Sequence, residues 1–293
     1  MVIVTGAAGK TGGEVVRLLS ARGIRVRALV RDPARTKGLT GPGVEVVVGD
    51  LTRPASLDPA FRGADKMFLV SSPDPNVEKL HGNAIEAAKR AGIRQVVRLS
   101  AHSASQASPV LLLRVHGEVD ELLSRSGLSF TILRPHAFFQ NTLFSASTVA
   151  SDGVIYGASR DGAIPMIDNR DVALAAAAVL TANGHSGRIY DLTGPEALTQ
   201  AQVAEKLSAV LERPVRYVDL PPDAFREGLR GALPEWLAAA YLDLTLLYAN
   251  GGQEERSDAF ERITGKKPRA YDQFARDFAS AFGGAGAAKA MAG

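Results

Sequence analysis

Three glycines at a spacing of three residues form the part of this sequence most suited to chemistry. Gly6, Gly9 and Gly12 lie in V-T-G-A-A-G-K-T-G, directly after a short apolar run. Glycines let backbone N–H groups approach a phosphate closely, because no side chain intervenes. Apolar residues recur at helical spacing from Gly13, so the turn opens a helix whose N-terminus favours an anion. Strand, turn and helix together predict a dinucleotide site formed by Gly6, Ala8, Gly9, Lys10, Thr11 and Gly12. A nucleoside-triphosphate P-loop is disfavoured, because Val4 stands where that motif needs its first glycine.

Residues that follow the next predicted strands are candidates for binding the rest of the dinucleotide. Arg31 comes first after V-R-A-L-V, where a guanidinium can pair with the 2′-phosphate of NADP. Asp32 follows it, and an acidic residue would instead suit the ribose hydroxyls of NAD. The order favours NADP(H) over NAD(H), although both residues could also be solvated turn residues. Further along the chain, adenine contacts are expected from Asp50 and Leu51, and contacts with the nicotinamide-side ribose from Val70, Ser71 and Ser72. A role for Asp50 as a turn residue is equally open.

Composition excludes several classes of function. The 293 residues are 46% hydrophobic and 22% charged, with a net charge of +3 and no run of basic residues, so no nucleic-acid partner is expected. There are no cysteines, and the five histidines are far apart, so no metal site is expected. The longest apolar stretch, Val172 to Leu180, is too short to span a bilayer. Met1 opens directly into a strand without a signal peptide, so we expect a cytoplasmic protein.

Strands and helices alternate along the chain, most regularly up to about residue 150. Seven strands are predicted, at Val2–Thr5, Val26–Val30, Val44–Val48, Lys66–Val70, Gln95–Leu99, Phe130–Leu133 and Arg188–Asp191. Helices are predicted at Gly13–Arg22, Ser56–Phe61, Val77–Ala91 and Val110–Ser126. Near-continuous apolar strands separated by helices predict a doubly wound α/β fold, with a parallel Rossmann-type sheet covered on both faces.

After about residue 150, strands and helices no longer alternate regularly, which predicts a second structural region. Residues 1–150 should form the dinucleotide-binding domain, with 171–192 returning to its sheet. Residues 151–170 and 193–282 should form a smaller mixed C-terminal substrate region, with a strand at Val215–Val218 and helical stretches at Asp223–Tyr248 and Gln273–Phe282. The glycine- and alanine-rich residues 283–293 are expected to be a disordered tail.

Several further motifs resemble the NmrA-like, atypical short-chain dehydrogenase/reductases, especially their quinone-oxidoreductase-like branch. Besides the glycine turn, they are A-L-V-R-D-P from Ala28, G-D-L from Gly49, H-G-E-V-D-E-L-L-S-R-S-G from His116, F-T-I-L-R-P from Phe130, N-R-D-V-A from Asn169 and T-G-K-K-P-R-A-Y-D-Q-F from Thr264. The resemblance extends to about residue 282. It implies a dinucleotide cofactor, usually NADP(H), and names no substrate.

The catalytic residues of ordinary short-chain reductases are missing. Those enzymes use a tyrosine acid with a lysine four residues later, whereas here Leu112 and His116 stand at the two positions. His116 could contact the cofactor and could transfer protons, given an ordinary pKa near 6.5. Ser100 matches the usual serine position, and together with His116 it is the candidate for catalysis. Alternatively, His116 could be a half-buried structural histidine of its helix, and His102 could be a solvated loop histidine.

Residues that follow the sixth predicted strand should line the substrate site. Pro135 is expected against the cofactor, and the expected pocket consists of His102, His136, Phe138, Phe139 and Asn141. Aromatic rings beside a nicotinamide would favour a flat, apolar small molecule. One of the two phenylalanines is expected to belong to the core instead.

These observations favour an NADP(H)-dependent oxidoreductase that passes hydride to an electron-poor acceptor such as a quinone. One alternative is a non-catalytic NADP(H)-binding redox sensor that regulates a partner. A sugar-nucleotide or isoprenoid-type reductase or epimerase is a weaker alternative, which the missing Tyr-Lys pair opposes. The sequence leaves the oligomeric state open.

Overall fold

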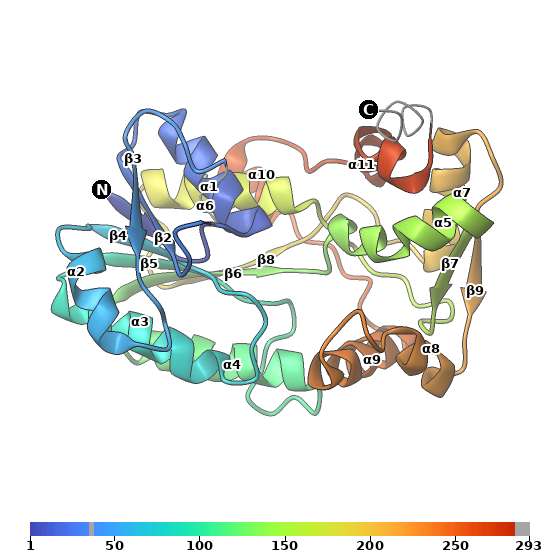
Figure 1. Cartoon of the computed structure of the whole chain (residues 1–293), viewed down its shortest axis with the longest axis horizontal. Helices are drawn as coiled ribbons and strands as arrows, with labels where there is room; N and C mark the ends of the chain where they lie inside the picture. The colour runs from blue at the N-terminus through green and yellow to red at the C-terminus, as the bar shows by residue number, and fades with distance from the viewer. Residues whose placement is uncertain (35–37, 285–293) are drawn as a thin grey trace. The chain divides into compact units, whose positions relative to one another are not determined.

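The structure, a computed structural model, describes residues 1–34 and 38–284, and they divide into two compact units (Figure 1). Unit 1 comprises Met1–Pro135, Asn169–Leu192 and Ala259–Lys266. Unit 2 comprises His136–Asp168, Thr193–Asp258 and the residues from Lys267 onward. The first boundary therefore follows Pro135, earlier than the expected residue 150. Most of the expected tail, 285–293, lies outside the described residues.

Unit 1 is built on a seven-stranded sheet in the order β3-β2-β1-β4-β5-β6-β8, with every neighbouring pair parallel. The strands are β1 (Val2–Val4), β2 (Val26–Val30), β3 (Val44–Val48), β4 (Lys66–Leu69), β5 (Gln95–Leu99), β6 (Ser129–Pro135) and β8 (Arg188–Leu192). The Rossmann-type sheet expected from the apolar runs is thus confirmed. The strand order reverses between β1 and β4, and such a reversal is where open α/β sheets bind ligands.

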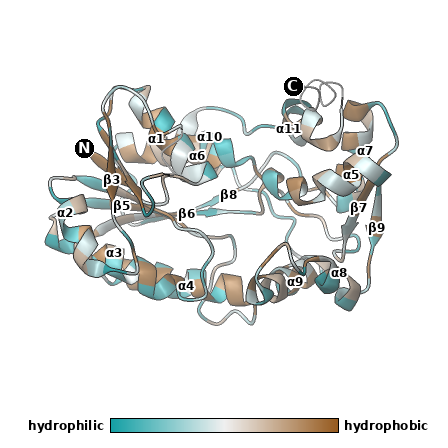
Figure 2. Ribbon diagram, in the orientation of Figure 1, coloured by the Kyte–Doolittle hydropathy of each residue, from teal (hydrophilic) through white to brown (hydrophobic). Residues whose placement is uncertain are grey.

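Helices cover both faces of this sheet (Figure 1). One layer holds α1 (Lys10–Ser20), α6 (Asn169–Thr181) and α10 (Ala259–Thr264), with α6 packed on both of the others. The other layer holds α2 (Leu57–Phe61), preceded by a 3-10 turn at Pro54–Ser56, together with α3 (Val77–Arg90) and α4 (Leu111–Ser124). Hydrophobic and hydrophilic residues alternate around α3 and α4 (Figure 2), as expected of helices with one buried face. Phe61, Met67 and Ile85 are among the buried residues of the core on this side.

Unit 2 contains a two-stranded parallel sheet of β7 (Val154–Gly157) and β9 (Arg216–Asp219). Its α-helices are α5 (Ala146–Asp152), α7 (Gln200–Leu211), α8 (Pro222–Gly228), α9 (Glu235–Ala249) and α11 (Tyr271–Asp277), with 3-10 helices at Phe139–Ser145 and Ala279–Phe282. The helical stretch expected from Asp223 to Tyr248 is two helices. The chain breaks between them because Gly231 adopts a positive φ of 81° and Pro234 disfavours helix at the residue before it.

Within the described residues, none of the helices has both the length and the apolar composition required for a membrane span.

Candidate functional site

The glycine turn follows β1 and is tied to the end of β4 through Thr5. The Thr5 hydroxyl donates to the carbonyl of Val70 at 2.7 Å, and the Val70 N–H donates back to the hydroxyl at 2.8 Å. The backbone then turns at Gly6, whose φ of 54° favours glycine, and the Gly9 N–H closes the turn on the Gly6 carbonyl at 2.9 Å. The turn therefore lies between the C-terminal ends of β1 and β4, at the reversal of the strand order.

The three glycines have different roles in this turn. A Cβ at Gly12 would lie 2.3 Å from the Gly6 carbonyl oxygen, and one at Gly6 would lie 2.7 Å from the Val70 carbonyl oxygen. Both positions are therefore closed to side chains by the fold itself. A Cβ at Gly9 would meet only the Gly6 oxygen, at 3.2 Å. Gly6 and Gly12 shape the turn, and Gly9 leaves its outer surface open.

The start of α1 offers backbone donors beside these glycines. The first N–H that bonds within the helix is that of Gly13, which donates to the Gly9 carbonyl at 2.9 Å. The N–H groups of Lys10, Thr11 and Gly12 precede it and have no acceptor inside the helix. No side chain caps them, and the first turn contains no acidic residue. Donors at a positive helix end, with a glycine surface in front of them, fit a pyrophosphate.

The ends of β2 and β3 carry the residues expected at the adenosine side. The exposed Arg31 has no hydrogen-bond or ion-pair partner within the described part of the chain. Asp32 accepts the Ala34 N–H at 2.9 Å, and Asp50 accepts the Thr52 N–H at 2.9 Å, so both carboxylates stabilise local turns. Burial raises the pKa of Asp50, but the Thr52 hydrogen bonds and the charges of Arg31 and Arg53 outweigh it, so the pKa is lowered.

Beyond β4, Ser71 pairs with a buried histidine that the sequence analysis did not single out. The Ser71 hydroxyl donates to the Ser72 carbonyl at 3.0 Å and lies 3.0 Å from Nε2 of His81 on α3. Burial, followed by the nearby Arg98, holds the pKa of His81 well below its ordinary value. The ring is therefore neutral, and its Nε2–H donates to Ser71.

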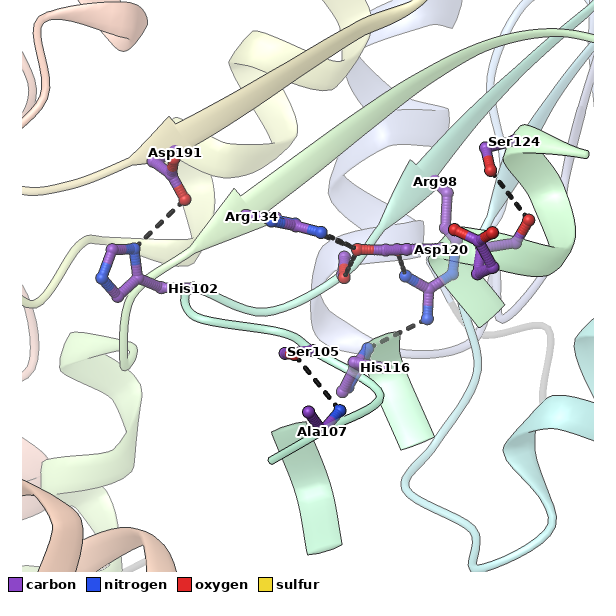
Figure 3. A network of polar contacts seen from close by, with 11 residues as sticks. Arg98, His102, Ser105, Ala107, His116, Asp120, Ser124, Arg134 and Asp191 are labelled. Atoms are coloured by element: carbon purple, nitrogen blue, oxygen red, sulfur yellow. Dashed lines mark hydrogen bonds and ion pairs between the residues drawn. The ribbon is translucent and has the colours of Figure 1, made fainter. Parts of the chain in front are cut away.

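A charged network at the ends of β5 and β6 joins two arginines to one aspartate (Figure 3). Arg98 of β5 is fully buried, and its Nη1 pairs with Oδ1 of Asp120 on α4. Arg134 of β6 donates from Nε and Nη2 to Oδ2 of Asp120, at 3.0 and 2.8 Å. The Ser100 hydroxyl donates to the same Oδ2 at 2.9 Å. Asp120 is thus held by two arginines and a hydroxyl, and the three charges sum to one positive.

This network changes the roles expected for the two candidate catalytic residues. Ser100 is buried, and its hydroxyl donates its hydrogen bond to Asp120. His116 of α4 lies with Nδ1 3.0 Å from Nη2 of Arg98. Burial and the charge of Arg98 lower the pKa of His116 to about 3. A lowered pKa keeps the imidazole neutral at neutral pH, which disfavours the proton transfer expected of His116. Its ring can still donate a hydrogen bond.

The sequence offered one signal for this network, which we missed. Arg98 and Arg134 both interrupt apolar strand sequences, V-V-R-L and T-I-L-R-P. An arginine inside a buried strand needs a counter-ion, because an unpaired buried charge is costly. Asp120, which provides it, lies 22 residues after Arg98.

The residues expected to line the substrate pocket belong to both units. In unit 1, the His102 N–H donates to the Pro135 carbonyl at 2.8 Å, and the His102 ring lies 3.2 Å from Asp191 (Figure 3). The other four, His136, Phe138, Phe139 and Asn141, belong to unit 2.

Within unit 2 these four residues differ in their exposure. The Phe139 ring is fully buried and stands edge-on to Tyr271, with centroids 5.1 Å apart, so it is the core residue of the two phenylalanines and not part of a pocket. His136 is buried and packs its ring 5.6 Å from that of Tyr248. Phe138 and Asn141 are only half-buried.

No cluster of three or more histidine, aspartate or glutamate side chains placed to hold a metal ion occurs among residues 1–34 and 38–284.

Comparisons with known proteins agree with the geometry of the glycine turn. A family model described as NAD(P)H-binding matches residues 6–183. The NAD(P)H azoreductase of Xenophilus azovorans is 37% identical over 97% of this chain and all of its own length. Quinone oxidoreductase 2 of Escherichia coli is 33% identical over 90% of this chain and 94% of its own. The crystal structure of the NADPH-dependent quinone oxidoreductase from Escherichia coli with NADPH superposes with a TM-score of 0.87, covering 95% of this chain and 99% of the other, at 31% identity.

Proposed function

This chain belongs to the NAD(P)H-binding, NmrA-like family, and from that premise we propose that it is a reductase that transfers hydride from NADPH to a flat, electron-poor acceptor such as a quinone. The observation that carries the cofactor assignment is the start of α1. Its first N–H groups lack helical acceptors and face a surface that only glycine at position 9 leaves open. The N–H groups of Lys10, Thr11 and Gly12 would hold the pyrophosphate against the open surface of Gly9. When bound, the nicotinamide would supply the hydride.

The preference for NADPH over NADH rests on Arg31. Its guanidinium ends β2 without a partner in the described part of the chain, whereas the neighbouring carboxylate of Asp32 is engaged by the Ala34 N–H. A free guanidinium can bind a 2′-phosphate in a bidentate manner, and an engaged carboxylate is less able to accept ribose hydroxyls.

The nature of the acceptor follows from the proton donors near the end of the sheet. Ser100 donates its hydrogen bond to Asp120, Asp120 is paired with two arginines, and His116 is neutral. None of these three groups can act as a strong acid at neutral pH. An acceptor that leaves a stable anion after hydride transfer needs no such acid, and the net positive charge of the network favours that anion. Quinones and electron-poor dyes meet this requirement better than simple ketones.

Stopped-flow measurement of NADPH oxidation across a panel of acceptors tests the proposal. The panel would include quinones, azo dyes, triphenylmethane dyes and simple ketones, each in excess over the enzyme. We expect fast single turnovers with the electron-poor acceptors and slow ones with ketones. Rapid reduction of plain ketones would show that a proton donor exists outside this set. Tight NADPH binding without turnover on any acceptor would contradict the proposal and support a redox sensor instead.

A further inference from the structure

The contact between Arg98 and His116 fixes where the histidine carries its proton. An arginine side chain has N–H donors and no acceptor. Because Nη2 of Arg98 lies 3.0 Å from Nδ1 of His116, that Nδ1 must accept the hydrogen bond and carry no proton. A neutral imidazole then carries its single proton on Nε2. Both the imidazolium and the Nδ1–H tautomer would place an N–H against an N–H.

Arg98 itself is held in place. Its side chain is fully buried, and its Nη1 is paired with Oδ1 of Asp120. Asp120 is fixed in turn, since its Oδ2 accepts from Ser100 and twice from Arg134. Nε of Arg98 is buried without a hydrogen-bond partner among the described residues, so the network uses two of the three nitrogens of this guanidinium. Moving Arg98 away from His116 would break the buried ion pair, which is costly.

The charges around His116 also oppose its protonation. Arg98 faces it from β5, with Arg134 of β6 behind, and Asp120 of the same helix α4 supplies the only negative charge of the network. His81 of α3 is neutral and donates to Ser71. One positive charge therefore remains beside the ring. The geometry and the charge balance both select the neutral form.

We propose that Arg98 is a positioning residue that locks His116 as the Nε2–H tautomer, so that His116 acts as a fixed hydrogen-bond donor to an oxygen of the bound dinucleotide. Ordinary short-chain reductases have a lysine at this helix position, whereas here the positive charge is on the buried Arg98 and the histidine provides only a neutral N–H. The identity of the ligand rests on the proposed function. The tautomer and its cause do not depend on the proposed function.

Long-range 1H–15N correlation spectra of the whole protein test the tautomer directly. Ring nitrogens that carry a proton and those that do not differ strongly in 15N shift, and His116→Gln identifies the signals among the five histidines. We expect an unprotonated Nδ1 and a protonated Nε2, unchanged from neutral pH down to about pH 5, well below the ordinary histidine pKa of about 6.5. An imidazolium, an Nδ1–H tautomer or a titration near the ordinary pKa would overturn the proposal, and this spectrum needs no variant that alters folding.

Two matched variants separate the role of Arg98 from a general loosening of Asp120. Arg98→Met removes the donor to His116, and we expect the pKa of His116 to rise from about 3 towards its ordinary value. Arg134→Met removes the other arginine of Asp120 but keeps the donor, and His116 should retain its tautomer. An equal change in both variants would show that the network acts only as a scaffold. If Arg98→Met does not fold, Arg98→Lys offers a milder test, in which the tautomer should be only partly retained.

Binding of NADPH tests what the tautomer is for. Arg98→Met and His116→Leu should each weaken NADPH by roughly two- to tenfold, the range of one neutral hydrogen bond, because leucine, unlike glutamine, has no N–H donor. The double variant should lose no more than either single variant, because the two residues act through one donor. Additive losses would contradict the coupling. Absence of quinone turnover would instead count against the proposed function and leave the spectra and the binding cycle intact.

Discussion

Replacing Gly9 with valine should abolish cofactor binding while the protein still folds. Gly9 has φ −85° and ψ 168°, extended backbone that β-branched residues adopt readily. A Cβ there would meet only the Gly6 carbonyl oxygen, at 3.2 Å, so the neighbour must yield by a few tenths of an ångström. Valine is also a poorer N-cap than glycine, which costs about 1 kcal/mol. The expected loss of stability corresponds to a shift in Tm of about 2–4 °C.

The effect on binding should be far larger. The Cβ and its methyl groups would occupy the surface beside the N–H groups of Lys10, Thr11 and Gly12, which we assign to the pyrophosphate. Hydrogen bonds to a charged group contribute about 1.5–3 kcal/mol each. Loss of two of them would cost about 3–6 kcal/mol, which weakens both NADPH and NADH by roughly 10²- to 10⁴-fold.

Calorimetric titration with NADPH and thermal unfolding would measure the two effects separately. Gly12→Ala is the matched control, because its Cβ would lie 2.3 Å from the Gly6 carbonyl oxygen. We expect this smaller substitution to lower Tm more than Gly9→Val does, since overpacking costs about 1–3 kcal/mol. A Gly9→Val protein that binds NADPH within threefold of the unmodified protein would refute the reasoning and place the phosphates elsewhere.

Two further predictions concern charge. Arg31→Ala should weaken NADPH by roughly ten- to a hundredfold and leave NADH almost unchanged, as one lost charge-assisted bond implies; equal affinities of the unmodified protein for both cofactors, measured by titration, would contradict this. The pKa of His116 is lowered on folding to about 3, so the unfolded chain takes up a proton first as the pH falls. Stability from this residue is therefore complete above about pH 6.5 and is lost below it by up to about 1.4 kcal/mol per pH unit. Urea unfolding between about pH 7 and pH 5 should show a smaller decline for His116→Gln than for the unmodified protein, and identical slopes would refute the shift.

Much of the fold could be predicted because its signals are local. The expected strands Val26–Val30, Val44–Val48 and Gln95–Leu99 match β2, β3 and β5 residue for residue. Each is a short, mostly apolar run bounded by polar or turn residues. β2 and β5 are buried, as a covered parallel sheet demands, whereas the edge strand β3 is largely exposed. We missed α7 although its start carries a readable signal: Thr199 and Gln202 form a capping box. The single helical stretch predicted from Asp223 to Tyr248 runs across Pro234, which instead stands at the N-cap of α9.

The candidate site was predictable only in part, for the same physical reason. A glycine turn indicates a dinucleotide site through residues that are adjacent in sequence. The pKa of His116 depends instead on its burial in the folded chain and on Arg98, which precedes it by 18 residues and pairs with Asp120 of α4. Sequence reasoning could assign His116 only its ordinary pKa, and with it a proton-transfer role.

The lowered pKa of His116 also bears on the missing tyrosine. If His116 titrated near neutral pH, it could replace the tyrosine as an acid, and simple ketones would be plausible acceptors. A neutral histidine beside a buried, net positive network stabilises negative charge but delivers no proton. Under the proposed function, such a site would lower the barrier for acceptors that accumulate negative charge and hold it, because preorganised charge acts at the transition state without reorganising. In the proposed function, the missing tyrosine and the buried Arg98 are therefore consistent with each other. The enzyme would need no protein acid, because its acceptor forms a stable anion after hydride transfer.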